Sequence, residues 1–394
     1  MPIELINTPG ISDASSNDIY DVNNTITSQF LSGSSLIKDN TIDGGDGSDK
    51  SSPIVFSSNN SIINGENGNN VWSQLSIIDN TLDASQSSGV SITADLEAQT
   101  VFFNDVTVSE TQTINVVNIA NVIGTNEADS IKGDSQNNQL TGLAGDDLID
   151  GRSGNDVIDG GLGNDTLIGG AGDDTFIGSS GNDSINGGDG LDTVDYSKLG
   201  QAITLSGVGT IIKTGGFGTD QVFQVETVIA DPTVANNTID ASQSLAGVSA
   251  TVNLETQTIS ANNVSGLGTL TYKVINFDDF SGTNEADSIT GDSQNNLLVG
   301  NAGNDTIIGG LGNDVLTGGL GADNFTFNSA NEGVDIIKDY NFVEGDVIQV
   351  SKLGFGTTNS SDFTYNASTG NLSFLGTQLA FVENLSSNVN IQLV

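Results

Sequence analysis

The chain has 394 residues, and its 50 acidic side chains against nine basic ones give a formal net charge of −41. It contains no His and no Cys, which excludes Ser-His-Asp and Cys-His catalysis and leaves only oxygen atoms as metal ligands. The few Lys and the single Arg, Arg152, form no basic patch, so nucleic acid is not expected as a partner.

The first 123 residues are predicted to be a strand-rich region. The start, MPIELINTPG, lacks the basic residues and apolar core of a signal peptide, and no stretch of the chain is apolar enough to form a transmembrane segment. Segments beginning at Gly44 and Gly65 are interpreted as decayed copies of the nine-residue repeat that follows later in the chain, with Trp72 as a core residue. Alternation from Val90 to Val101 predicts strands.

A first repeat array covers residues 124–195, in eight nine-residue units of unbroken register. Each complete unit places Gly at positions one and four, Asp at position six and a large apolar residue at position eight. One apolar residue per nine fits neither an amphipathic helix nor a long strand, but it fits a short strand after each turn. Two units then make one coil, and stacked coils form a parallel β-solenoid, so the fold class is all-β.

Residues 196–281 are predicted to be a strand-rich connecting module, followed by a second array of five units over residues 282–326. The segment 80–142 recurs at 237–300, with GTNEADSI and GDSQNN repeated identically. Whether the segments between the arrays continue the solenoid or form small sandwiches stays open. Residues 327–394 are predicted to cap the open end of the solenoid.

The turns of the repeats favour an all-oxygen metal site. Gly at positions one and four permits open turns in which carbonyl oxygens converge, and Asp at position six adds a carboxylate. Units two apart lie on the same edge of adjacent coils, so their carboxylates and carbonyls face each other. Such a flexible cage suits Ca²⁺ better than Mg²⁺, which demands a stricter geometry.

The units resemble the GGxGxDxUx nonapeptide of RTX, or haemolysin-type, calcium-binding proteins, which fold as β-rolls. The resemblance implies that each ion is held by the position-six Asp of two turns eighteen residues apart, together with backbone carbonyls. The implied pairs are Asp147 with Asp165, Asp156 with Asp174, Asp165 with Asp183, Asp174 with Asp192, and Asp305 with Asp323. The implied carbonyl ligands belong to Gly145, Gly154, Gly161, Gly163, Gly170, Gly172 and Gly303.

Four further pairs depart from the family pattern. Glu127 and Glu285 replace the position-four Gly, which weakens the pairs Asp129 with Asp147 and Asp287 with Asp305. Asn138 and Asn296 replace the position-six Asp, which weakens the pairs with Asp156 and Asp314; Asp314 is retained as a candidate ligand. Arg152, at a variable turn position, is interpreted as a surface counter-charge.

The resemblance implies a secreted protein of the cell exterior or surface, exported by a type I exporter that reads the C-terminal region. We expect no enzymatic activity and a structural or adhesive role, with cell-surface or matrix polysaccharide as a candidate partner. The alternative is a divergent polysaccharide-acting enzyme of lyase or epimerase type, with its active site on coils that bind no calcium. A third alternative, an ice- or surface-binding solenoid, would need a flat ladder of Thr residues, which is not seen.

Overall fold

The structure is a computed structural model that describes residues 80–105, 111–207 and 209–394, together with five short strands nearer the N-terminus. These strands are β1 (Ile19–Asp21), β2 (Thr41–Asp43), β3 (Val55–Ser57), β4 (Ser61–Asn64) and β5 (Leu75–Ile78). The incomplete repeats predicted at Gly44 and Gly65, and Trp72 with them, lie outside the described residues. The chain divides into two compact units, residues 1–194 with 220–225, and residues 195–219 with 226–394.

Nearly all regular structure in the described residues is β-strand, which confirms the all-β prediction. The exceptions are the four-residue helix α1 (Lys352–Phe355) and the two 3₁₀ turns η1 (Thr214–Gly216) and η2 (Ser360–Asp362). No helix in the described part of the chain is long and apolar enough to cross a membrane.

In the first unit, successive repeat strands alternate between two parallel sheets. One sheet contains β6 (Thr81–Asp83), β10 (Asn121–Ile123), β12 (Gln139–Ala144), β14 (Val157–Leu162) and β16 (Thr175–Ile177). The other contains β7 (Val90–Asp95), β11 (Ser130–Lys132), β13 (Leu148–Ser153), β15 (Thr166–Ala171) and β17 (Ser184–Asp189). Leu140 pairs with Ile158, and Ile149 pairs with Leu167, each eighteen residues later. Two nonapeptides therefore make one coil, as predicted.

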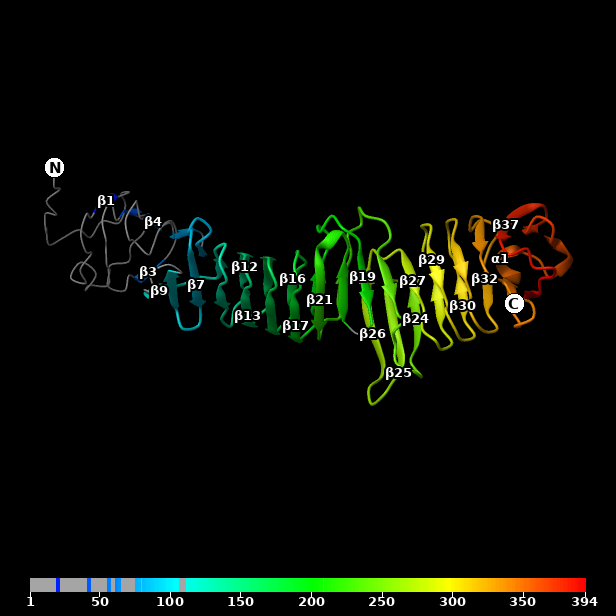
Figure 1. Ribbon diagram of the computed structural model, residues 1–394, viewed down its shortest axis with the longest axis horizontal. Helices are drawn as coiled ribbons and strands as arrows, with labels where there is room; N and C mark the ends of the chain where they lie inside the picture. The colour runs from blue at the N-terminus through cyan, green and yellow to red at the C-terminus, as the bar shows by residue number, and fades with distance from the viewer. Residues whose placement is uncertain are drawn as a thin grey trace. The chain divides into compact units, whose positions relative to one another are not determined.

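In the second unit, strands of the connecting module, the second array and the C-terminal segment belong to the same two sheets. One sheet contains β22 (Thr227–Ile229), β24 (Ser249–Asn253), β28 (Ser288–Thr290), β30 (Thr306–Ile308), β32 (Asn324–Phe327), β34 (Val347–Val350) and β38 (Ile391–Leu393). The other contains β19 (Ile203–Ser206), β23 (Thr238–Asp240), β27 (Asp279–Ser281), β29 (Leu297–Val299), β31 (Val315–Thr317), β33 (Asp335–Ile337) and β37 (Thr377–Val382). The module between the arrays therefore continues the solenoid in this unit, and Figure 1 shows β27, β29, β30 and β32 following one another along it.

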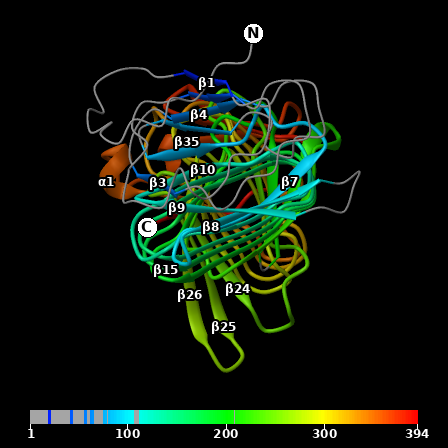
Figure 2. The same cartoon turned by 90° about the vertical axis from the view of Figure 1, so that its left-hand side faces the viewer.

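Antiparallel hairpins interrupt these ladders. In the first unit, β8 (Thr100–Asp105) and β9 (Thr111–Val117) extend β7. In the second unit, the added strands are β20 (Thr210–Lys213), β25 (Thr258–Val264), β26 (Gly268–Ile275), β35 (Phe363–Asn366) and β36 (Asn371–Phe374). The β25–β26 hairpin reaches beyond the coils of its own unit (Figure 2). The strands β18 (Thr193–Asp195) and β21 (Gly218–Phe223) lie at the division between the units.

Within the arrays, the core consists of position-eight side chains contributed alternately by the two sheets, as the repeat pattern predicts. All of them are at most 1% exposed: Ile131, Leu140, Ile149, Ile158, Leu167, Phe176, Ile185 and Val194 in the first unit, and Ile289, Leu298, Ile307, Leu316 and Phe325 in the second. Within array strands such as β11 and β31, the central side chain is buried and its neighbours are partly exposed, because side chains alternate across a strand.

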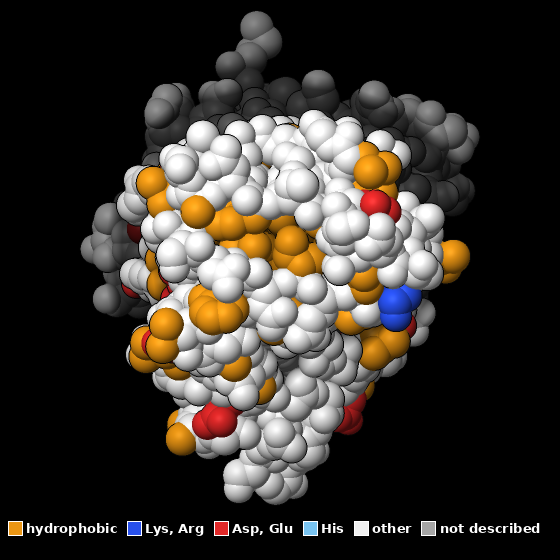
Figure 3. Space-filling model, turned by 90° about the vertical axis from the view of Figure 1, so that its right-hand side faces the viewer, with side chains coloured by type: hydrophobic (Ala, Val, Ile, Leu, Met, Phe, Trp, Pro, Cys, Tyr) orange, Lys and Arg blue, Asp and Glu red, His pale blue; other side chains and the backbone are white. Residues whose placement is uncertain are grey.

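The C-terminal segment adds aromatic side chains beyond the last repeat. Phe355, Phe363 and Phe374 pack with ring centroids 4.9–5.2 Å apart, and Tyr340 packs 6.3 Å from Phe325 of the array. Figure 3 shows the face that carries this segment, where hydrophobic side chains lie in a central hollow among mostly uncharged ones.

Replacing Leu316 with Ala tests the thin core. Because Leu316 is fully buried, the variant should lose about 2–5 kcal/mol of unfolding free energy through lost burial and a new cavity. The matched variant Leu311→Ala, at a side chain that is 51% exposed, should change stability by no more than about 0.5 kcal/mol. Denaturant unfolding in saturating calcium measures both, and equal losses would contradict the assignment of position eight to the core.

Candidate metal centre

The position-six aspartates stack in columns along the edges of the coils. In each step, the backbone N–H of one Asp donates to Oδ1 of the Asp eighteen residues later. The predicted pairs joined in this way are Asp147 with Asp165 (2.9 Å), Asp156 with Asp174 (2.8 Å), Asp165 with Asp183 (3.0 Å), Asp174 with Asp192 (2.8 Å) and Asp305 with Asp323 (2.9 Å). The fold thus brings together every pair of carboxylates that the resemblance implies.

The second oxygen of most of these carboxylates is buried and has no hydrogen-bond partner. This holds for Oδ2 of Asp147, Asp156, Asp165, Asp174, Asp305, Asp314 and Asp323. A buried anionic oxygen without a partner is costly, and the same kind of atom repeats at nearly every complete turn. These orphaned oxygens fit a hard cation such as Ca²⁺, which they would bind through their negative charge.

Backbone carbonyls gather at the same turns. A Cβ added to Gly142 would overlap Oδ2 of Asp147 and lie 2.6 Å from the carbonyl oxygen of Gly160, so carboxylate and carbonyl oxygens converge beside Gly142. Gly163 has φ +140°, and a Cβ there would overlap the carbonyl oxygen of Gly145. Only glycine permits this conformation and this approach, which explains why position four is Gly in complete units.

The described residues contain no cluster of three or more acidic side chains that could hold a metal ion. The expected cage needs only two carboxylates, because backbone carbonyls supply its other oxygens, and Ca²⁺ accepts such mixed oxygen sets. The geometry of the columns, with two stacked Asp side chains and carbonyls beside them, matches that ligand set.

In the first coil of each array, the side-chain oxygens at position six already accept hydrogen bonds from the protein. Asp129 accepts the N–H of Ile92 on Oδ1 and the N–H of Thr125 on Oδ2, both at 2.6 Å. Asn138 accepts the N–H of Asp134 at 2.9 Å, and its side-chain amide donates to the carbonyl of Ala120 at 2.9 Å. The equivalent bonds in the second array join Asp287 to Ala250 and Thr283, and Asn296 to Asp292 and Asp278. These are the turns whose pairs were considered weaker from the sequence.

Arg152 does more than serve as the surface counter-charge that was predicted. Its guanidinium binds Asp95 bidentately at 2.8 and 2.9 Å, contacts Glu97 at 3.2 Å and donates to the carbonyl of Gly133 at 2.7 Å. Hydrogen bonding to Asp95 raises the pKa of Arg152, and the same bond lowers the pKa of Asp95. At the same turn position of the second array, the side-chain amide of Asn301 donates to the carbonyl of Gly282 at 2.7 Å.

Three column residues were not predicted from the sequence: Asp220, Asp335 and Asp346. Their Oδ1 atoms accept the N–H groups of Asp183 (3.0 Å), Asp314 (3.0 Å) and Asp323 (2.9 Å), respectively. Asp220 lies in GGFGTDQVF, residues 215–223, which follows the nonapeptide pattern completely and could have been found by searching outside the registered arrays. Asp335 and Asp346 follow irregular spacings that no nonapeptide register detects.

Burial controls the charge state of the columns. In the calcium-free protein, burial is the main cause that raises the pKa of Asp147 and Asp305 to about 7, and that of Asp165, Asp174 and Asp323 to about 6. Neighbouring carboxylates raise these pKa values further, whereas the backbone N–H bonds oppose the shift.

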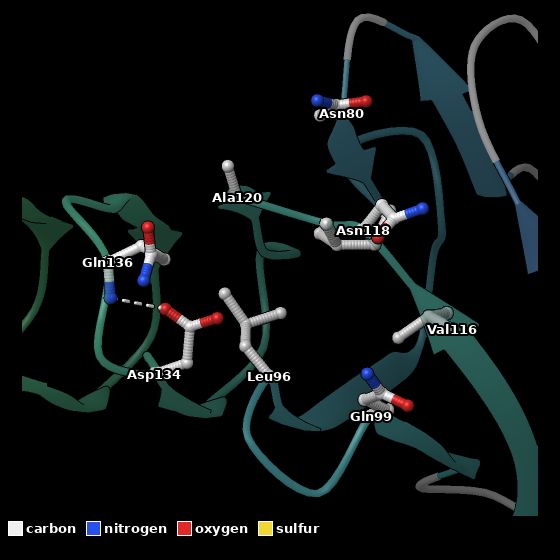
Figure 4. A pocket seen from close by; sticks show the side chains of 9 residues that line it. Asn80, Leu96, Gln99, Val116, Asn118, Ala120, Asp134 and Gln136 are labelled. Carbon is white, nitrogen blue, oxygen red and sulfur yellow. Dashed lines mark hydrogen bonds between the residues drawn. The ribbon is translucent and has the colours of Figure 1, made fainter.

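A pocket of about 270 Å³ lies in the first unit beside β6, outside the columns. Figure 4 shows its lining, which includes Leu96, Val116 and Asn118 and a single acid, Asp134. Oδ1 of Asp134 accepts the backbone N–H of Gln136 at 2.8 Å. The pocket therefore offers one carboxylate, which a turn hydrogen bond already engages.

The family model of the RTX calcium-binding nonapeptide repeat matches four segments of the chain: residues 123–158, 159–194, 277–305 and 290–325. The chain carries RTX calcium-binding repeats. The matched segments cover both arrays and less than a third of the chain, and RTX repeats bind Ca²⁺. The RTX assignment agrees with the β-roll architecture and with the orphaned carboxylate oxygens.

A search of curated proteins finds no match to this RTX chain. Among solved structures, the chain is similar to the extracellular lipase LipA from Serratia marcescens, with 18% identity and a TM-score of 0.17. The alignment covers 71% of this chain and 44% of the lipase chain, so the chain spans less than half of the lipase's length.

Replacing Asp165 with Asn tests the columns of the RTX arrays. Asp165 contacts Asp147 on one side and Asp183 on the other, so the variant should bind one or two fewer calcium ions and need more calcium to fold. The matched control Asp146→Asn removes the same charge from an exposed neighbouring turn position and should behave as the wild type. Calcium counting by native mass spectrometry checks both, and an unchanged count for Asp165→Asn would argue against the columns as ligands.

Without calcium, acid should stabilise the arrays. The pKa of Asp147 is about 7 in the folded chain against an ordinary value of 3.8, so the folded state binds the proton more tightly. The stabilisation that this proton gives to the folded state is complete below pH 3.8 and is lost as the pH rises to about 7. Circular dichroism in chelator should therefore show more β-structure at about pH 6 than at about pH 8, a range where exposed carboxylates stay ionised. An equal circular dichroism signal at both pH values would contradict the burial of these carboxylates in the folded arrays.

Proposed function

We propose that this chain is a non-enzymatic calcium-binding protein of the cell exterior that folds as its RTX arrays bind several Ca²⁺ ions. The observation that supports this most directly is the repeated buried Asp oxygen without a partner, beside converging carbonyls. Its use at the cell exterior is structural or adhesive, with surface or matrix polysaccharide as the proposed partner class.

Calcium supplies the positive charge that the stacked carboxylates need at neutral pH. The column residues hold their position through backbone bonds of 2.8–3.0 Å, which fix Oδ1 and leave Oδ2 directed toward the ion site. With free calcium about tenfold above the dissociation constant, each site contributes about 1.4 kcal/mol. Five sites would contribute about 7 kcal/mol, which is comparable to the stability of a whole domain.

This coupling suits export in an unfolded state. In a low-calcium cytosol, mutual repulsion of the carboxylates opposes stacking, and a core of one large side chain per nine residues offsets little of it. The chain would pass an exporter of the type I class unfolded and fold in the higher calcium outside. The export signal is proposed to lie within residues 327–394.

Calcium titration tests the proposed binding. The full chain should gain β-sheet signal as calcium is added and lose it in chelator, whereas Mg²⁺ should produce little change because it demands a stricter octahedral geometry. Single-site affinities are expected in the range of extracellular modules, about 10⁻⁴ to 10⁻³ M, and tighter where coils cooperate. An equal response to both ions, or full β-structure in chelator, would refute the proposal.

Export is tested with a fusion of residues 327–394 to an inert reporter. Cells with a working type I exporter should release the fusion, and cells without the exporter should retain it. Retention of the fusion by cells that do export the full chain would show that the signal lies elsewhere.

A further inference from the structure

The segment 331–335, which follows the second array and lies outside the matched repeats, adopts the turn of a complete repeat. The N–H of Gly312 donates to the carbonyl of Glu332 at 2.7 Å, as Gly303 donates to Leu320 at 2.9 Å within the array. Gly333 has φ +122°, and a Cβ there would overlap the carbonyl oxygen of Gly312.

The side chains of this turn continue the same ladder. The N–H of Val334 donates to Oδ1 of Asn313 at 2.9 Å, a bond made within the array between Ala322 and Asn304. The N–H of Asp314 donates to Oδ1 of Asp335 at 3.0 Å, the bond that joins each pair of array aspartates. The spacing from Asp314 to Asp335 is 21 residues rather than 18, which is why no nonapeptide register includes it.

Two carboxylate oxygens meet beside Gly309. A Cβ added there would overlap Oδ2 of Asp314 and lie 3.1 Å from Oδ2 of Asp335. Asp314 is 0% exposed, Asp335 is 2% exposed, and Oδ2 of Asp314 has no hydrogen-bond partner. The nearby acid Glu332 is engaged separately, because its carboxylate accepts the N–H of Asn328 at 2.9 and 3.0 Å.

We propose that Asp314, Asp335 and the carbonyl of Gly312 hold a further Ca²⁺ ion at the junction of the second array and the C-terminal segment. The choice of ion rests on the proposed calcium binding of the arrays, since the donor set is the same. Asp335 begins β33, which pairs in parallel with β31 of the array and with β37 of the C-terminal segment. An ion at this point therefore makes the docking of the C-terminal segment onto the array dependent on calcium.

Anomalous diffraction from crystals of the full wild-type chain grown with calcium tests the site directly. The expected result is a peak about 2.4 Å from an oxygen of both Asp314 and Asp335, the usual Ca–O distance. Peaks between Asp305 and Asp323 without one at Asp335 would overturn this inference alone. No peak at any column would overturn the proposed calcium binding as well.

Calcium counting on full-length variants gives an independent test. Asp335→Asn keeps the Oδ1 acceptor for Asp314 but removes the charge, so it should bind one calcium ion fewer than the wild type in native mass spectrometry. Glu344→Gln removes one charge from an exposed position of the same segment and should keep the wild-type count. An undiminished count for Asp335→Asn would overturn the site; if that variant does not fold, the wild-type diffraction experiment decides.

Discussion

The stacking of buried carboxylates is the constraint on which the rest of the structure depends. Each complete repeat inserts one Asp that is at most 3% exposed directly above another, and most of these side chains have one oxygen without a partner. A core of single side chains such as Ile149 and Leu316 cannot by itself offset rows of buried like charges. Protons or cations at these positions would remove this repulsion, which is why we propose that the folding of the arrays depends on calcium and pH.

The close approach of the coils follows from the same arrangement. Carbonyl oxygens of one turn lie against the Cα atoms of the turn two units later, as Gly145 lies against Gly163. Glycine is needed there for both space and positive φ. At position two the requirement is weaker, since Leu143 and Arg152 adopt φ +83° and +69° with a Cβ present. The difference explains why Gly is more regular at position four than at position two.

Both arrays begin with a coil whose turn oxygens are satisfied by the protein itself. The duplicated residues GTNEADSI and GDSQNN supply some of these donors, including Thr125 in the first array and Thr283 in the second. From the next coil, Arg152 and Asn301 donate to turn carbonyls of this first coil. Each array thus passes from hydrogen-bonded turns to turns with orphaned oxygens, and the same order occurs twice because the whole segment is duplicated.

The nonapeptide pattern alone determined the all-β class, the two-unit coil, the buried position-eight side chains and the pairing of Asp residues eighteen apart. These features are local, because a fixed period places equivalent atoms one above another wherever the register is unbroken. The tertiary structure alone decided where the columns end. Asp220 follows Asp183 by 37 residues, and Asp335 follows Asp314 by 21, because the intervening chain leaves the coil and returns. Once the period is broken, spacing along the sequence no longer specifies spatial neighbours, and only the backbone ladder shows that these carboxylates continue the columns.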